Sequence, residues 1–312
     1  MPPNKTTNEG EKTFKYTEIF HSFQGEGAKT GRSTAWIRFF LCNLSCSGFG
    51  QTDPTDPTSY VLPYQDFDVE GITRVEDLPV FDFGCDSAYS WAKRYRHLAH
   101  DDSAIQICDN IQNVLSHPSN PEGLFLHPIT EQNHHMAFTG GEPMLNQDAI
   151  TLILYEFKSR NNLPTQVTVE TNGTKPFKGK EQLDKFISTF YSSWDDREWF
   201  WSVSPKLWST AGEKAKKAIK PEVVGSYAEI SDNGQLKFVV NGSQESWDEV
   251  EQNIELFAAE GVDWDIYIMP VGATKESQEE NIIAEIAMEA LKRGYHFSGR
   301  LHCSVFGNVV GT

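Results

Sequence analysis

The chain has 312 residues, of which 44 are acidic and 27 basic, so its formal charge at neutral pH is −17. This length suits one large domain or two small ones, because domains typically hold ~100–200 residues. The acidic excess argues against a protein that binds nucleic acid through phosphates, and no apolar run approaches the ~20 residues of a membrane-spanning helix. Residues 1–9 are polar and lack the apolar core of a signal peptide, so we expect a cytoplasmic protein. Residues 1–13 are expected to form a disordered tail, and residues 14–312 one domain.

Short, β-prone apolar runs alternate with amphipathic helical patterns along the chain. The expected strands are residues 35–41, 166–170, 199–203, 235–240, 265–269 and 300–305. The clearest expected helices are residues 147–159, 246–259 and 276–293. Strands that alternate with helices predict a mainly parallel sheet, because parallel strands need long connections. We therefore expect an α/β fold, either an open sheet or a partial barrel, with its site at the carboxyl ends of the strands.

Residues 47–84 interrupt this alternation. The segment holds four prolines, eight acidic residues and a single base, Arg74. Prolines break helices and strands, and a structureless loop of this length is uncommon in a compact domain. Five aromatic residues favour packing against the core over free disorder: Tyr60, Tyr64, Phe67, Phe81 and Phe83. We expect a long loop or a small irregular subdomain.

The five cysteines are too few and too irregularly spaced for a secreted disulfide framework. Two of them, Cys42 and Cys46, follow the first expected strand within one short loop. Thiolates bind zinc, copper or iron–sulfur clusters, but two thiols alone are equally compatible with buried core residues. Cys108 and Cys303 are expected to be core residues of that kind.

Two glycine-containing loops allow a close approach to a polar ligand. The segment Thr139-Gly140-Gly141-Glu142-Pro143 follows an apolar stretch and precedes a helix, so its backbone amides could face a ligand. Residues 22–27 carry Gln24 and Glu26 beside glycines. Taken alone, each loop is a weak signal, because most glycine turns are structural.

In combination these motifs resemble the radical S-adenosylmethionine (SAM) superfamily and, within it, the 7-carboxy-7-deazaguanine synthase family of queuosine and 7-deazapurine biosynthesis. The segments that carry the resemblance occur in the same order as in the family: residues 23–27, Arg38, residues 42–46, 85–91, 140–143, 170–174, 204–206 and 300–302. The resemblance extends from about residue 16 to the C-terminus. It implies a partial (β/α) barrel of the radical SAM type with a long acidic insertion in its cluster-binding loop.

The resemblance also implies a [4Fe-4S] cluster on three cysteines, with SAM bound to the open iron. The usual short spacing would put the third cysteine at position 49, where this chain has Phe49. Either the cluster is lost, or Cys85 supplies the third thiolate beyond an insertion of residues 47–84. The sequence after Cys85 resumes the family pattern, and the entropic cost of closing a loop grows only slowly with its length. We therefore favour the insertion, with Cys42, Cys46 and Cys85 as ligands.

Further site residues follow from the resemblance, position by position. Those expected to bind the cofactor are Gly84, Asp86, Gly141, Glu142, Ser204, Pro205, Lys206, Met269 and Pro270. Those expected to bind the substrate are Phe23, Gln24, Gly25, Glu26, Arg38, Thr139, His302 and the C-terminal Thr312. Ser87 stands where the family has a threonine that binds Mg²⁺, and its hydroxyl is an equally hard oxygen donor. No catalytic side chain is assigned.

Arg38 and His302 also have structural interpretations. An arginine within an apolar strand needs a partner, which could be the carboxylate of a substrate or a structural salt bridge. His302, within the strand expected at residues 300–305, could equally be a buried core histidine.

The implied enzyme is a lyase that converts 6-carboxy-5,6,7,8-tetrahydropterin to 7-carboxy-7-deazaguanine with loss of ammonia, after a 5′-deoxyadenosyl radical abstracts a hydrogen. The family also implies a homodimer and an electron donor such as flavodoxin, and we expect no nucleic-acid or membrane partner. Two alternatives remain: a radical activating enzyme for a protein substrate, and a non-catalytic binding protein with a degenerate cluster. Gln24, Glu26 and His302 favour a small heterocyclic substrate. The insertion is expected to cover the site or to dock the electron donor.

Overall fold

The computed structural model describes residues 12–190, 197–274, 281–307 and 310. Its strands are β1 (Thr13–Phe23), β2 (Ser33–Phe39), β3 (His100–Ser103), β4 (His135–Gly140), β5 (Gln166–Thr171), β6 (Glu198–Val203), β7 (Gly234–Val240), β8 (Asp265–Pro270) and β9 (His296–Phe297). Its helices are α1 (Pro63–Asp66), α2 (Ala104–Leu115), α3 (Gln147–Ser159), α4 (Lys180–Phe190), α5 (Trp208–Ala211), α6 (Ala215–Ala218), α7 (Pro221–Ala228), α8 (Gln244–Ala259), α9 (Asn281–Lys292) and α10 (Leu301–Phe306). Short 3-10 turns occur between them.

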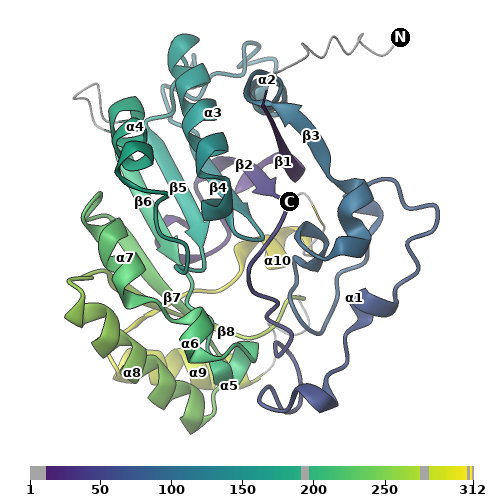
Figure 1. The fold of residues 1–312 in the computed structure, drawn as a ribbon, viewed down its shortest axis with the longest axis vertical. Coiled ribbons are helices and arrows are strands. Elements are labelled where there is room, and N and C mark those ends of the chain that lie inside the picture. Colours follow the sequence, from purple (N-terminus) through teal and green to yellow (C-terminus); the bar gives the residue numbers. More distant parts are fainter. Residues whose placement is uncertain (1–11, 191–196, 275–280, 308–309, 311–312) are drawn as a thin grey trace.

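These strands form one sheet with the order β3-β1-β2-β4-β5-β6-β7-β8-β9. Strand β2 and strands β4 to β9 pair in parallel, whereas β1 runs antiparallel to both β2 and β3. In the described part of the chain β3 and β9 do not pair, so the sheet is an open, partial barrel, as the sequence predicted. Helices α2, α3 and α4 cover one part of the sheet and α7, α8 and α9 the other (Figure 1).

The two faces of the sheet have different surroundings. Because successive residues of a strand point to opposite faces, Phe138, Trp201 and Phe238 share one face and pack into the main hydrophobic core, together with residues of α2, α3 and α8. The opposite face presents polar side chains, among them Arg38 and Lys237, to a cavity. The sheet therefore separates an apolar core from the candidate site.

Most of the predicted elements agree with the structure. The helix predicted at residues 147–159 coincides with α3, and the strands predicted at residues 166–170, 199–203, 235–240 and 265–269 lie within β5, β6, β7 and β8. The strand predicted at residues 35–41 overlaps β2, which ends at Phe39, and α8 begins two residues before the predicted start. The tail predicted at residues 1–13 lies mainly outside the described residues, and β1 already begins at Thr13. The start of the helix predicted at residues 276–293 also lies outside them, and α9 forms its remainder.

Residues 300–305 are the exception, because the strand predicted there is wrong. The run from Leu301 to Val305 alternates apolar and polar residues like a strand, but a pattern this short does not distinguish a strand from a helix. It forms α10, which follows Arg300 and ends at Gly307 in the left-handed conformation, with φ 71°. His302 therefore lies in the first turn of a helix.

Residues 47–84 form an irregular unit with a small core of its own, which includes α1 (Figure 1). Tyr64 and Phe81 are buried there against Tyr95, and the Tyr95 hydroxyl donates a hydrogen bond to the Tyr64 carbonyl at 2.6 Å. Tyr95 lies beyond Cys85, so the segment that follows this cysteine completes the core of the insertion. The sequence pattern did not reveal that contribution.

Replacing Tyr64 with alanine is expected to open the insertion without unfolding the sheet. Tyr64 is 3% exposed, and removing a buried aromatic side chain costs ~3–5 kcal/mol. Limited proteolysis under native conditions should then cut within residues 47–84 faster than in the unsubstituted protein. Val61→Ala, at a 57% exposed position of the same segment, should leave the cleavage rate unchanged. Equal rates for the two variants would contradict a packed insertion.

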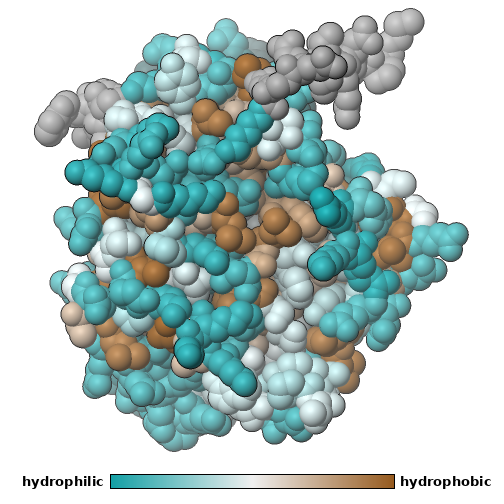
Figure 2. Space-filling model, in the orientation of Figure 1, coloured by the Kyte–Doolittle hydropathy of each residue, from teal (hydrophilic) through white to brown (hydrophobic). Residues whose placement is uncertain are grey.

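The face shown in Figure 2 is largely hydrophilic, with apolar residues in small, separate groups. Scattered surface apolar residues of this kind are normal for folded proteins. No helix among the described residues is both long and apolar enough to cross a membrane.

Candidate functional site

A cavity of about 290 Å³ lies on the polar face of the sheet. The predicted site residues that line it are Phe23, Gln24, Gly25, Glu26, Arg38, Cys42, Cys46, Gly84, Cys85, Asp86, Ser87, Thr139, Gly141, Ser204, Lys206, Met269 and His302. The predicted residues Glu142, Pro205 and Pro270 do not line it, and Thr312 lies outside the described residues. Segments that are far apart in the sequence thus converge on one space.

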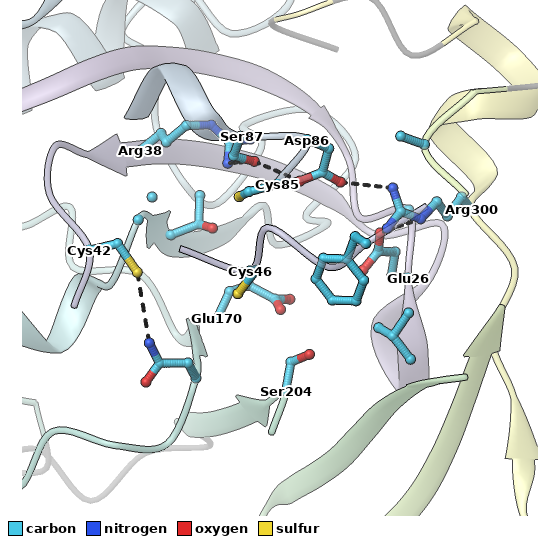
Figure 3. A pocket seen from close by; sticks show the side chains of 18 of the residues that line it. Glu26, Arg38, Cys42, Cys46, Cys85, Asp86, Ser87, Glu170, Ser204 and Arg300 are labelled. Carbon is cyan, nitrogen blue, oxygen red and sulfur yellow. Dashed lines mark hydrogen bonds and ion pairs between the residues drawn. The ribbon is translucent and has the colours of Figure 1, made fainter. Parts of the chain in front are cut away.

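Three thiols face this space (Figure 3). Cys42, Cys46 and Cys85 belong to one small apolar cluster that also contains Phe49, and none of the five cysteines forms a disulfide. The Gly84 N–H donates to the Phe49 carbonyl at 2.8 Å, so the end of the insertion returns to its beginning. This return places Cys85 beside the other two cysteines.

The donor set fits an iron–sulfur cluster. Among the described residues, no three His, Cys, Asp or Glu side chains lie close enough to share a single metal ion. A four-iron cluster has a different requirement, because each thiolate binds its own iron and the thiols stand apart around it. Three soft sulfur donors on the wall of one cavity meet that requirement.

The pKa values of the three thiols are raised. Burial is the main cause in each case, and it brings the pKa of Cys42 to about 12. Two groups donate hydrogen bonds to the Cys42 sulfur: the Leu44 N–H at 3.4 Å and the Asn172 side-chain amide at 3.9 Å. The free thiols are neutral at pH 7, so binding of iron releases their protons.

A glycine pair brings the turn after β4 against the cysteine loop. A Cβ atom at Gly141 would lie 2.2 Å from the Leu41 carbonyl oxygen and 2.8 Å from the Cβ of Cys42. Gly140 has a φ of 140°, which L-residues rarely adopt. Glycine is therefore needed here for the close approach of two protein segments, and both glycines also line the cavity.

Glu142 connects two strand ends beneath the cavity. Its carboxylate is fully buried and accepts hydrogen bonds from the Thr171 hydroxyl at 2.6 Å and from the Asn172 N–H at 2.8 Å. Burial raises the pKa of Glu142, and these hydrogen bonds lower it in part. The side chain thus fixes the loop that follows β4 against the end of β5.

Arg38 has the structural partner that the sequence left open. Its Nε donates to the Glu18 carboxylate at 2.7 Å, and a second guanidinium nitrogen donates to the Ser87 hydroxyl at 3.2 Å. The Tyr89 hydroxyl donates to the same Glu18 oxygen at 2.5 Å. Arg38 also lines the cavity, so the salt bridge orients a guanidinium that remains next to the ligand space.

Two cations that the predicted site did not include lie in the same cavity. Lys237 is 2.5 Å from Glu26 and 3.4 Å from Glu170. Arg300, shown in Figure 3, is 3.4 Å from Glu26 and 2.9 Å from Asp86. Only 4% of the Lys237 side chain and 10% of the Arg300 side chain are exposed. A sequence signal for Lys237 existed, because a lysine within the apolar run at residues 235–240 needs a partner as Arg38 does.

The pKa values of the acidic groups and of His302 that line the cavity are shifted by burial and by the neighbouring cations. Burial raises the pKa of Glu26, but Lys237 and Arg300 outweigh burial and hold that pKa well below its ordinary value. Burial likewise raises the pKa of Asp86, and Arg300 outweighs it. Burial lowers the pKa of His302. At neutral pH the cavity therefore presents ionised carboxylates, buried cations and a neutral imidazole.

The first and last motifs of the chain meet at the cavity. The Leu301 N–H donates to the Gly25 carbonyl at 2.9 Å, and a Cβ at Gly25 would lie 2.0 Å from Nδ1 of His302. The Gln24 side chain donates to Glu170 at 2.8 Å. Gly25 therefore makes room for His302, and Gln24 is held toward β5.

Comparisons with known proteins agree with this arrangement. No family model matches the chain. A protein named 7-carboxy-7-deazaguanine synthase from Halobacterium salinarum is 26% identical, with 100% of both chains covered. Another of that name, from Rhodopirellula baltica, is 26% identical over 97% of this chain and 90% of its own. The crystal structure of QueE from Escherichia coli shares the fold, with a TM-score of 0.50 and 17% identity over 93% of this chain and 95% of that one. The full-length similarities agree with the resemblance inferred from the motifs: the chain is similar over its whole length to proteins named 7-carboxy-7-deazaguanine synthase and shares the fold of QueE.

Proposed function

We propose that this protein is a radical SAM lyase that converts 6-carboxy-5,6,7,8-tetrahydropterin to 7-carboxy-7-deazaguanine. The observation that carries the proposal is that three thiols and several charged and polar side chains line one cavity. The chain is also similar over its whole length to a protein named as such a synthase. The atoms balance as one substrate giving one product and one ammonia, so no net oxidant or reductant is consumed.

Cys42, Cys46 and Cys85 would hold the [4Fe-4S] cluster. Together with SAM, that group supplies the radical that removes a hydrogen from the substrate. Lys206 and Ser204, joined by a 2.9 Å hydrogen bond, lie on the wall of the same cavity and would bind SAM beside Gly141. The predicted contacts of Gly84, Asp86 and Met269 with SAM are compatible with their place in the lining.

The other polar side chains that line the cavity would bind the pterin. A carboxypterin presents a carboxylate, ring N–H donors and carbonyl acceptors, and the cavity offers matching groups. Arg38 can pair with the carboxylate, whereas Glu26, held ionised by Lys237, can accept from N–H groups. His302 and Thr139 complete this side of the cavity.

We also propose that Mg²⁺ binds at Ser87 together with the substrate. The Ser87 hydroxyl donates to the neighbouring carboxylate of Asp86 at 3.1 Å, so two hard oxygen donors lie side by side. Ser87→Ala should reduce the apparent affinity for Mg²⁺ roughly 10–100-fold, measured as activity against Mg²⁺ concentration. Ser87→Thr should retain it. Loss of iron from Ser87→Ala, or no dependence of activity on Mg²⁺, would contradict this role.

Residues 14–312 are proposed to act as one domain, in the cytoplasm and as a homodimer, with a small redox protein such as flavodoxin as electron donor. A reducing compartment would keep the five free cysteines available. Of the two roles expected for the insertion, covering the site has structural support, because Pro79, Val80 and Asp82 line the cavity. Deletion of residues 52–77 with full activity would contradict that role.

The function is tested with anaerobically reconstituted protein, reductant, SAM and 6-carboxy-5,6,7,8-tetrahydropterin. We expect 7-carboxy-7-deazaguanine and ammonia in equal amounts. 5′-Deoxyadenosine without deazaguanine would indicate a different substrate. A protein that assembles no four-iron cluster would refute the enzyme assignment and favour a binding role.

A further inference from the structure

The loop that carries Cys42 and Cys46 is held from a distant part of the chain. Glu213, in the turn between α5 and α6, accepts backbone hydrogen bonds from Ser45 at 2.6 Å and from Cys46 at 2.9 Å on the same oxygen. Its other oxygen accepts from Lys217 at 3.1 Å. Only 6% of the Glu213 side chain is exposed, so this carboxylate is buried against the loop.

The conformation that Glu213 holds is an unfavourable one. Cys46 has a φ of 48°, in the left-handed region where a Cβ atom crowds the backbone and which residues other than glycine, asparagine and aspartate seldom adopt. Consecutive N–H groups in turns of this kind point the same way and form a concave site for an anion. The Glu213 carboxylate occupies that site. The backbone geometry that directs the Cys46 thiol is thus stabilised by a charge supplied from elsewhere in the fold.

The backbone beside Glu213 holds the same loop. The Gly48 N–H donates to the Ala211 carbonyl at 3.0 Å, and a Cβ at Gly48 would lie 2.6 Å from the Gly212 nitrogen. Gly212 also faces the insertion, because a Cβ there would lie 2.1 Å from the Tyr60 hydroxyl. The turn at residues 211–213 therefore lies between the cysteine loop and the insertion and contacts both.

We propose that Glu213 is a positioning residue for the cluster. It holds Ser45 and Cys46 in the geometry that presents the Cys46 thiolate to iron, and its negative charge makes reduction of the bound cluster less favourable. The second effect follows because reduction adds negative charge, and a buried carboxylate close to a ligand opposes that addition. This inference rests on the proposed function, since it assumes that the three thiols bind a cluster.

The experiment compares Glu213→Ala and Glu213→Gln with a matched control at Glu249. Glu249 accepts backbone hydrogen bonds from Trp208 at 2.7 Å and from Ser209 at 3.0 Å, so it caps α5 much as Glu213 holds the cysteine loop. Its carboxylate hydrogen bonds lie on the α5 side and not on the cysteine loop. Glu249→Ala therefore reports the effect of destabilising the same small helix without releasing Ser45 and Cys46.

The first measurement needs no cluster. In the apo-protein, amide hydrogen exchange at Ser45 and Cys46 should be at least roughly tenfold faster in Glu213→Ala than in the unsubstituted chain, because these amides lose their acceptor. Glu249→Ala should leave that rate unchanged. Unchanged exchange in Glu213→Ala, or an equal increase in Glu249→Ala, would overturn the positioning role. If Glu213→Ala does not fold, Glu213→Gln should give a smaller increase at the same two amides.

The second measurement uses the reconstituted proteins. Glu213→Gln keeps an acceptor oxygen and removes the charge, so it should bind as much iron as the unsubstituted protein and be reduced at a less negative potential. We expect the ratio of reduced to oxidised cluster at a fixed potential to rise roughly tenfold, which is about 59 mV for a one-electron couple. An unchanged potential would overturn the charge effect. If the unsubstituted protein binds no four-iron cluster, the proposed function fails, whereas the exchange measurement still decides whether Glu213 holds the loop.

Discussion

Cys85→Ala is expected to abolish assembly of the four-iron cluster and all measurable formation of 5′-deoxyadenosine. The thiol of Cys85 shares one apolar cluster with Cys42 and Cys46, and the hydrogen bond from Gly84 to Phe49 closes the insertion directly before it. With only two thiolates left, a site of this type cannot hold the cluster. Iron and sulfide content, the visible absorbance of the cluster and deoxyadenosine yield measure the loss.

Cys108→Ala provides the matched control. Cys108 is fully buried in the main core, where its thiol donates to the Ile153 carbonyl, so the substitution removes a buried cysteine without touching the cavity. It should leave iron content and turnover as they are. A four-iron spectrum retained in Cys85→Ala would show that the insertion does not supply the third ligand. That result would favour the alternative of a non-catalytic binding protein with a degenerate cluster.

Lys237→Met should be the most destabilising substitution on the polar wall and should remove substrate turnover. Lys237 is buried between Glu26 and Glu170, and removing one partner of a buried ion pair costs ~3–5 kcal/mol, because the remaining charge is left uncompensated. Chemical denaturation near pH 7 measures the loss of stability. Lys185→Met, at an exposed lysine paired with Glu181 on α4, is the control and should leave unfolding unchanged.

The loss of unfolding free energy caused by Lys237→Met should become smaller as the pH falls. In the unsubstituted protein the pKa of Glu26 is held below its unfolded value of 4.5, so its contribution to stability is present above that pH and is lost as the pH falls through the folded value. Without Lys237, burial is opposed mainly by Arg300, so the pKa of Glu26 is higher than in the unsubstituted protein and its ionised form stabilises the fold less at neutral pH. The difference in unfolding free energy between the two proteins should therefore shrink as the pH is lowered from 7 toward 4. A constant difference would show that the charge of Glu26 is not what Lys237 stabilises.

Strands β2, β5, β6, β7 and β8 of the parallel part were predictable because they are buried on both faces, whereas the parallel strands β4 and β9 were not predicted. Residues 199–203 and 235–240 read as short apolar runs between helical patterns, and β6 and β7 agree with them closely. Strand β1 was not predicted, because it runs antiparallel near the edge of the sheet and mixes apolar residues with Lys15, Glu18 and His21. The strand predicted at residues 300–305 was wrong, because its alternation of apolar and polar residues is short. These residues form α10, which follows the last strand of the sheet instead of joining it.

The site residues that belong to sequence motifs were predictable. Those whose role depends only on tertiary contacts were not. The cavity brings together most of the residues identified through the family resemblance, including Arg38 and Cys85. Lys237 was missed although a charged residue within an apolar strand is a usable signal. No sequence signal could have indicated Glu213, because its importance depends on hydrogen bonds to residues more than 160 positions away. Local pattern carries no information about such a contact.

The docking of α10 against Gly25 has a consequence for the order in which the protein is made. The hydrogen bond from Leu301 to Gly25 and the ion pair between Arg300 and Glu26 join the two ends of the described chain. During translation Cys42, Cys46, Cys85, the glycine turn and Lys237 all leave the ribosome before Arg300 does. A nascent chain can therefore gather its three thiols while one wall of the cavity is still missing, and that wall closes only after Arg300 and Leu301 have left the ribosome.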